Sequence, residues 1–282
     1  MSYAFPLALC TCLKSILNKL TSEVSYGFEN MDNPKYQPRN YRQKFNNLRF
    51  TGFQVSYLET DLWIGVDPGS YRETMKRVTE SRIIELRQTL DDYIASDPGF
   101  ATSLTPFRPS KAAPPEVKEL TGASSLAGIG PMASVAGLFS REAGKVICEN
   151  FPVKELVVEN GGDIFVLLKE ELVLSVFAGD SPLSEKVGMI IPAEMKEIGI
   201  CTSSGTVGPS LSFGQADAVA VVCKDVLLAD AFATALGNKV KSPESIHRVL
   251  EISEKFPEII AVVIICEDKV GVRGELEIKL LK

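Results

Sequence analysis

A carboxylate and a hydroxyl lie four residues apart in the segment 229–238, Ala-Asp-Ala-Phe-Ala-Thr-Ala-Leu-Gly-Asn. The segment is typical of a helix, and its spacing places Asp230 and Thr234 one above the other on one helix face. Two oxygen donors on one face suit a hard cation such as Mg2+. Two structural alternatives stay open: Asp230 caps the start of the helix, or Thr234 hydrogen-bonds to its own backbone.

Cys201 directly precedes a polar turn, Thr202-Ser203-Ser204-Gly205, where a thiol can meet a ligand. A reactive thiol needs a lowered pKa. The six cysteines of the chain include no Cys-x-x-Cys pair, and four of them lie inside apolar runs, as buried free thiols do. The pattern favours Cys201 as a core residue, with a reactive thiol as the alternative, and it indicates a reducing, cytoplasmic compartment.

Composition narrows the classes of function. The 282 residues suffice for one large domain or two small ones, with 45% hydrophobic and 23% charged residues, as in globular proteins. The net charge is −6 and no lysine or arginine stripe stands out, which argues against a nucleic-acid partner. The one histidine, His247, lies in an amphipathic pattern. Multi-histidine zinc sites are therefore excluded, and a histidine-based triad would have only this residue as its base.

The first 30 residues differ in pattern from the rest of the chain. They have neither the basic start nor the small residues before a cleavage point that a signal peptide needs. We interpret residues 1–30 as an amphipathic or disordered extension, or as a mis-assigned start with Met31 as the true beginning. Residues 31–282 are then expected to form a single domain. No apolar run reaches the length of a membrane span.

Strands and helices are expected in clusters. Asn160-Gly161 is the strongest hairpin signal, because this pair tolerates the positive φ that tight hairpin turns need. The predicted strands are 50–59, 62–66, 155–159, 164–169, 172–177, 187–191, 198–202, 216–223, 259–266 and a final hairpin of 269–273 and 275–281. The predicted helices are 70–96, 131–149, 229–238 and 242–255. Such clusters predict an α+β fold with an antiparallel sheet rather than a doubly wound parallel sheet.

Three segments in order resemble the ApbE family, the flavin transferases that move FMN from FAD onto a protein threonine. They are 159–164 (Glu-Asn-Gly-Gly-Asp-Ile), 201–205 (Cys-Thr-Ser-Ser-Gly) and 229–235 (Ala-Asp-Ala-Phe-Ala-Thr-Ala). They match that family's Asn-x-Gly-Gly-Asp, Thr-Ser-Gly and Ala-Asp-x-x-Ala-Thr elements. The resemblance covers residues 120–240 and implies the ApbE-like T-fold, with two related antiparallel α+β halves around a central cleft.

The resemblance also implies a ligand site. Asp230 and Thr234 match the family's magnesium ligands. The turn that lines its flavin cleft matches Asn160, Gly161, Gly162 and Asp163, and the strand end beside it matches Thr202 and Ser203, with Ser204 adjacent. A glycine pair lets backbone amides approach phosphate or ring oxygens, and Mg2+ can bridge a pyrophosphate. The implied cofactors are Mg2+ and FAD or another nucleotide.

Two elements of the transferases are missing. Their Gly-x-x-x-Lys-Gly signature corresponds to residues 128–137 here, which contain no lysine. Their His-x-x-Asp-Pro segment corresponds to 212–218, Ser-Phe-Gly-Gln-Ala-Asp-Ala, without histidine or proline. These departures argue against full flavin transfer. The whole pattern resembles the shorter, uncharacterised ApbE-like branch of archaea and anaerobic bacteria, which has been associated with sulfide assimilation and homocysteine formation in methanogens.

Three functions stay open on this resemblance, and whether the protein is an enzyme stays open with them. The first is a divergent Mg-dependent protein that binds FAD or another nucleotide. The second is an accessory role in sulfide assimilation and homocysteine biosynthesis, with Cys201 as its thiol. The third is an FAD:protein FMN transferase. The expected partner is a small-molecule ligand or a sulfur-assimilation protein, without nucleic acid or membrane, and self-association is expected by analogy.

Overall fold

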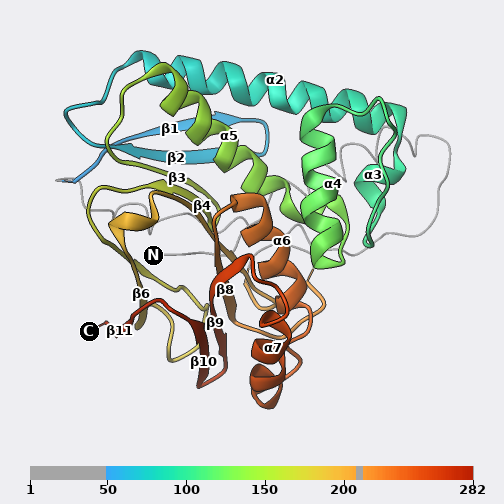
Figure 1. The fold of residues 1–282 in the computed structure, drawn as a ribbon, viewed down its shortest axis with the longest axis vertical. Helices are drawn as coiled ribbons and strands as arrows, with labels where there is room; N and C mark the ends of the chain where they lie inside the picture. The colour runs from blue at the N-terminus through green and yellow to red at the C-terminus, as the bar shows by residue number, and fades with distance from the viewer. Residues whose placement is uncertain (1–48, 208–211, 282) are drawn as a thin grey trace.

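Residues 49–207 and 212–281 are described by the computed structural model of this chain (Figure 1). The predicted extension 1–30 and the alternative start at Met31 lie outside the described residues. The assignment of 31–282 to a single domain therefore stays a prediction.

The described residues are organised around one antiparallel sheet of eight strands. Its order is β1-β2-β3-β4-β7-β8-β9-β10, so the strands follow one another in chain order, with β5 and β6 left out between β4 and β7. The strands are β1 (Thr51–Tyr57), β2 (Thr60–Val66), β3 (Leu156–Asn160), β4 (Asp163–Leu167), β7 (Glu197–Ser203), β8 (Ala218–Cys223), β9 (Ile259–Cys266) and β10 (Lys269–Gly274). The predicted α+β fold with an antiparallel sheet is confirmed.

The two halves of this sheet repeat one order of elements: two strands, then helices, then two strands. The first half inserts its helices between β2 and β3, and the second half inserts them between β8 and β9. The helices are α2 (Thr74–Ser96), α3 (Gly99–Thr102), α4 (Pro115–Ala127), η2 (Pro131–Ser134), α5 (Val135–Asn150), η3 (Ala193–Met195), α6 (Val226–Gly237), η4 (Pro243–Ser245) and α7 (Ile246–Ser253). In Figure 1, α2 runs along one side of the molecule, next to α5 and α4.

Two apolar cores cover the two faces of the large sheet. Helices α2, α4, α5 and α6 pack on one face. A second sheet of three strands, in the order β11-β6-β5, packs on the other. Its strands are β5 (Leu172–Ser175), β6 (Val187–Ile191) and β11 (Ile278–Leu280). Burial on both faces explains why β8 is buried along its whole length and reads as a continuous apolar run rather than an alternating one.

The predicted final hairpin of 269–273 and 275–281 is wrong. β10 pairs with β9, whereas β11 leaves the large sheet and pairs with β6. The chain turns between the two sheets at Gly274, whose φ is 114°. A Cβ atom there would lie 2.3 Å from the carbonyl oxygen of Ile260, so the bend needs glycine.

Among the described residues, no single helix is long and apolar enough to cross a membrane. By length and composition, only α4 together with Pro131–Asn150 meets that requirement, and this pair is bent by 99°.

Candidate functional site

The β3–β4 turn and the end of β7 lie side by side at one end of the large sheet. Gly161 and Gly162 form the turn with φ angles of 65° and 109°, which confirms the predicted hairpin. Asp163 is in register with Cys201, and the Thr202 amide donates a hydrogen bond to the Gly162 carbonyl oxygen at 3.2 Å. Two of the segments singled out in the sequence therefore meet in space.

Helix α6 brings the third segment to the same place. Near its start, a Cβ atom on Gly199 of β7 would lie 2.4 Å from the Val226 Cα. At its end, Gly237 lies beside Ser203 of β7, with 3.5 Å between a Cβ built on the glycine and the serine Oγ. α6 thus follows β7 in the direction of the β3–β4 turn, and Asp230 lies midway along it.

Asp230 does not cap its own helix. The N-cap of α6 is Asp225, whose Oδ1 accepts a hydrogen bond from the Leu227 amide at 2.8 Å. Asp230 is only 4% exposed, and its Oδ2 accepts a hydrogen bond from the Gly137 amide of α5 at 2.8 Å. The capping alternative fails for α6, and the side chain instead binds the first turn of another helix.

Asn160 binds the other side of the same peptide group of α5, the one between Ala136 and Gly137. Its Nδ2 donates to the Ala136 carbonyl oxygen at 3.0 Å, next to the Gly137 amide bound by Asp230. A Cβ atom on Gly137 would lie 3.0 Å from both the Asp230 Cβ and the Val226 carbonyl oxygen, so glycine is what allows the two helices to approach here. Ala136 and Gly137 were missed by the sequence interpretation. The available signal was a glycine inside an alanine-rich helix.

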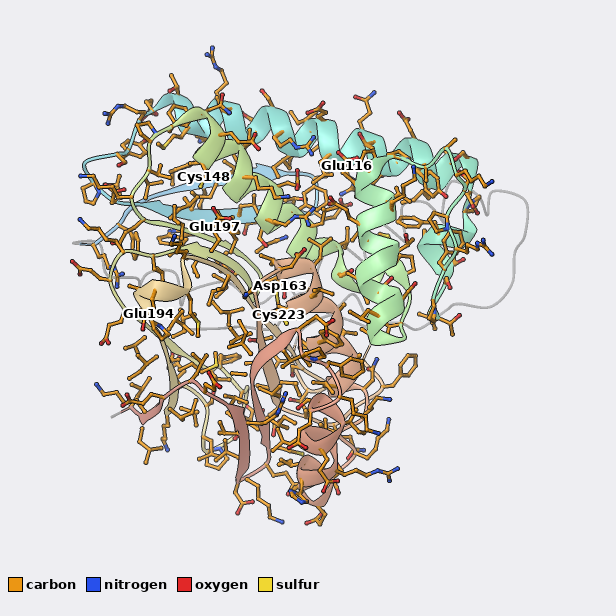
Figure 2. The ribbon with its side chains drawn as sticks, viewed as in Figure 1. Glu116, Cys148, Asp163, Glu194, Glu197 and Cys223 are labelled. Atoms are coloured by element: carbon orange, nitrogen blue, oxygen red, sulfur yellow. The ribbon has the colours of Figure 1, made fainter. Side chains whose placement is uncertain are left out.

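The charge of Asp230 is poorly compensated. Burial raises the pKa of its carboxyl to about 7, although the Gly137 hydrogen bond acts in the opposite direction. Within residues 49–207 and 212–281, no basic side chain contributes to that pKa. A second carboxylate, that of Asp163 at the start of β4, is also buried; the residue is labelled in Figure 2. Two buried carboxylates therefore lie at this end of the sheet.

Cys201 lies between these two acids and is fully buried. Its Sγ donates to the Val226 carbonyl oxygen at 3.5 Å, and the thiol also hydrogen-bonds to Asp163. Burial, followed by the charges of Asp163 and Asp230, raises the pKa of the Cys201 thiol well above its usual value. A thiol in this setting is protonated at neutral pH, so the nucleophile hypothesis has no physical basis here.

The remaining predicted site residues differ in burial and in the hydrogen bonds that their side chains make. Thr234 and Ser203 are half-buried, and Thr202 is buried. Ser204 is committed to its own turn, since its Oγ accepts hydrogen bonds from the Thr206 and Val207 amides at 3.1 and 2.9 Å. His247 is exposed on α7, 3.2 Å from Glu251, and offers no base to this site.

The donor chemistry fits a hard cation, within limits. Asp230, Thr234 and Asp163 present only oxygen atoms, which Mg2+ prefers. Across the described residues, no group of three or more His, Cys, Asp or Glu side chains could hold a metal ion by itself. A Mg2+ ion usually takes one or two protein carboxylates and completes its shell with water and phosphate oxygens. The site therefore suits a magnesium-bound phosphate ligand better than a protein-only metal centre.

Comparisons with known proteins identify relatives of this chain. Residues 42–254 match the family model described as AbpE bacteria. A UPF0280 protein of Methanocella arvoryzae is 40% identical over 194 residues, covering 69% of this chain and 78% of the relative. A UPF0280 protein of Methanococcus vannielii is 37% identical over 227 residues, covering 79% and 90%. The apo crystal structure of the Pseudomonas stutzeri flavinyl transferase ApbE has a TM-score of 0.52 at 13% identity, covering 79% of this chain and 93% of that one.

Proposed function

Because this chain belongs to the uncharacterised ApbE-like branch that includes the archaeal UPF0280 proteins, we propose that it binds a nucleotide such as FAD through Mg2+. Asp230 and Thr234 would hold the ion, with Asp163 close by. Gly161 and Gly162 would admit phosphate oxygens to the backbone of the turn. The ion would supply positive charge to a phosphate group.

One observation carries this proposal: Asp230 is a buried carboxylate with a single hydrogen bond from the described residues and a pKa raised to about 7. Burying an unpaired charge is unfavourable, and a bound cation removes that cost. Thr234 lies one helical turn further along the same face of α6, half-buried, where a ligand oxygen can reach it. A purely structural carboxylate would gain nothing from Mg2+.

These residues support nucleotide binding without transfer of the flavin to a protein. The transferase lysine is absent from residues 128–137, and the only histidine of the chain is exposed on α7. The accessory role in sulfide assimilation finds no support in the described thiols. Cys201, Cys223 and Cys266 are buried, and burial raises the pKa of half-buried Cys148 to about 11. In Figure 2, Cys148 lies on α5 near Glu197, apart from Asp163.

The proposal is tested by thermal unfolding with FAD in the presence of Mg2+ or of EDTA. At a ligand concentration of about 100 Kd, binding adds about 2.7 kcal/mol of stability. For a chain of this size, that corresponds to a rise in Tm of about 5–10 °C. We expect the rise only with Mg2+ and FAD together. Asp230→Asn should abolish it, since the amide keeps an acceptor for Gly137 but loses the charge.

Asp225→Asn is the matched control, because it makes the same substitution on the same helix at an N-cap position where asparagine serves equally well. Its rise in Tm with Mg2+ and FAD should equal that of the parent. A parent protein that shows no rise, or an Asp230→Asn variant that keeps it, would rule out the proposed function.

A further inference from the structure

The connection between β7 and β8 places Phe213 at the same end of the sheet. The Phe213 amide donates to the Asn238 Oδ1 at 2.9 Å, and the Lys241 ammonium donates to the Phe213 carbonyl oxygen. Two residues further on, the Gln215 amide donates to the Val240 carbonyl oxygen at 2.8 Å. The backbone of residues 213–215 is therefore tied to the residues that follow α6.

Glycine contacts hold the same loop from two sides. A Cβ atom on Gly214 would lie 1.9 Å from the Gly237 carbonyl oxygen, and one on Gly205 would lie 2.2 Å from the Gly214 carbonyl oxygen. Three backbone segments therefore touch where only glycine fits. Gly237 is also the residue beside Ser203 at the end of β7, so the loop is continuous with the candidate site.

These contacts involve the backbone of residues 213–215 and leave the side chain of Phe213 exposed. It is 54% exposed, and within the described residues it is the only aromatic side chain that is exposed. A single exposed apolar residue is ordinary on a protein surface. Here, however, the aromatic ring stands on a backbone that is hydrogen-bonded at both its amide and its carbonyl group, so little conformational entropy is lost when a flat ligand covers it.

We propose that Phe213 is a stacking platform for the planar ring of the ligand whose phosphates lie at Asp230 and Thr234. This inference rests on the proposed function and adds a determinant of specificity to it. Gly237 lies seven positions after Asp230 on α6, which is about 10 Å along the helix axis. A nucleotide spans such a separation between its phosphates and its ring, so one ligand can reach both places.

The test compares affinities for FAD and for inorganic pyrophosphate, both measured with Mg2+ by calorimetry. Stacking on an aromatic side chain is worth a factor of about 5 to 150 in affinity. Phe213→Ala should weaken FAD binding by that factor and leave pyrophosphate binding unchanged, because pyrophosphate has no ring. Phe213→Tyr should keep the parent affinity for FAD. FMN and ADP are then tested separately, because FMN carries the flavin ring and ADP carries the adenine ring. The ligand whose affinity falls in Phe213→Ala carries the ring that stacks.

Leu280→Ala is the control, since Leu280 is also exposed but lies on β11 in the small sheet. It should bind FAD as the parent does. The stacking role is wrong if Phe213→Ala binds FAD like the parent, or if it loses FAD and pyrophosphate equally, which would indicate a disturbed loop. A parent that binds neither ligand refutes the proposed function itself, so the two failures are distinguishable.

Discussion

The Asp230 carboxylate accepts a hydrogen bond from the first turn of α5, and in the proposed function it also binds a cation. The partial positive charge at a helix N-terminus favours the ionised form, and the Gly137 amide supplies the hydrogen bond. Burial outweighs both and raises the pKa of the carboxyl to about 7. At neutral pH the side chain is therefore poised between its two protonation states, and a cation would decide between them.

This balance predicts an unusual pH dependence of stability in the ligand-free protein. The pKa of Asp230 is raised in the folded state above its usual value of 3.8, so its contribution is fully present below about pH 4 and is lost as pH rises through about 7. The loss is on the order of 2–4 kcal/mol. Asp230→Asn should remove this loss, as measured by urea denaturation at pH 5 and pH 8.

Mg2+ with FAD provides the internal control for that measurement. Because the cation binds the ionised carboxylate, it should restore stability to the parent at pH 8 more than at pH 5, and it should do nothing to Asp230→Asn. If the variant loses as much stability between the two pH values as the parent does, the dependence comes from other groups.

At the scale of residues, the sequence could predict side chains but not their backbone partners. The helical spacing correctly indicates that Asp230 and Thr234 share a helix, and the ordered segments correctly indicate that the glycine turn and Cys201 are neighbours. The hydrogen bonds of Asn160 and Asp230 to the 136–137 backbone could not be predicted. Main-chain groups are alike at every position, so no pattern marks which of them will be used.

At the scale of elements, two glycines allow α6 to pack closely against its neighbours, β7 and α5. Gly199 lets the start of α6 touch β7, and Gly137 lets α5 approach its middle. Glycine normally weakens a strand, and its presence inside β7 is explained by the close approach of another backbone. The position of Asp230 relative to the β3–β4 turn depends on these contacts.

Gly199→Ala should therefore be strongly destabilising. The added methyl would lie 2.4 Å from the Val226 Cα and 2.8 Å from its amide nitrogen, so backbone has to move. Because this overpacking forces the backbone to shift, we expect a loss of about 1–3 kcal/mol in the free energy of unfolding. The matched control is Gly122→Ala in α4, where the methyl would meet nothing within 4 Å.

Gly122→Ala should raise stability by about 0.5–1 kcal/mol, because alanine is the better helix former. Urea denaturation of both variants measures the contrast in sign. Equal effects from the two substitutions would mean that the contact between β7 and α6 is not tight.

Local patterns predicted most of these elements but not α4, and long-range pairing accounts for the error in the final hairpin. The predicted β1–β2 and β3–β4 hairpins follow from apolar runs separated by short turns, whereas the pairing of 269–273 with β9 was not predicted. The 275–281 strand has the same local appearance, but it pairs with β6, about ninety residues earlier in the chain. Nothing local distinguishes a strand that returns to its neighbour from one that crosses to a second sheet.

At the scale of the whole molecule, partly buried ion pairs join α2 and α4 to α5 and α6, the two helices of the candidate site. Arg82 of α2 lies 3.1 Å from Glu116 of α4 and 2.6 Å from Glu142 of α5. Arg141 of α5 pairs with Glu142 at 3.1 Å and reaches Asp225 at the start of α6 at 3.5 Å. Glu116 is labelled on α4 in Figure 2. Glu142 therefore lies between two arginines at the centre of a network that spans four helices.

Glu142 should make the fold sensitive to acid. Burial raises its pKa, but the hydrogen bond from Arg82 and the charges of Arg141 and Lys145 lower it more, so the net shift is downward. For a lowered carboxyl pKa, the stabilisation is present above the unfolded value near 4.5 and is lost as pH falls through the folded value. Glu142→Gln should cost about 1–3 kcal/mol at pH 7, because the buried guanidinium group of Arg141 and the partly buried one of Arg82 lose their shared partner.

The cost of Glu142→Gln should shrink towards pH 3, where the parent carboxyl is itself being protonated. Urea denaturation at pH 7 and pH 3 measures it. Glu85→Gln removes an exposed partner of the same Arg82, 3.2 Å away, and should cost only about 0.3–0.5 kcal/mol. If both variants lose the same small amount at pH 7, the network is held by solvent-screened charges, and the helices around Asp230 are positioned by apolar packing alone.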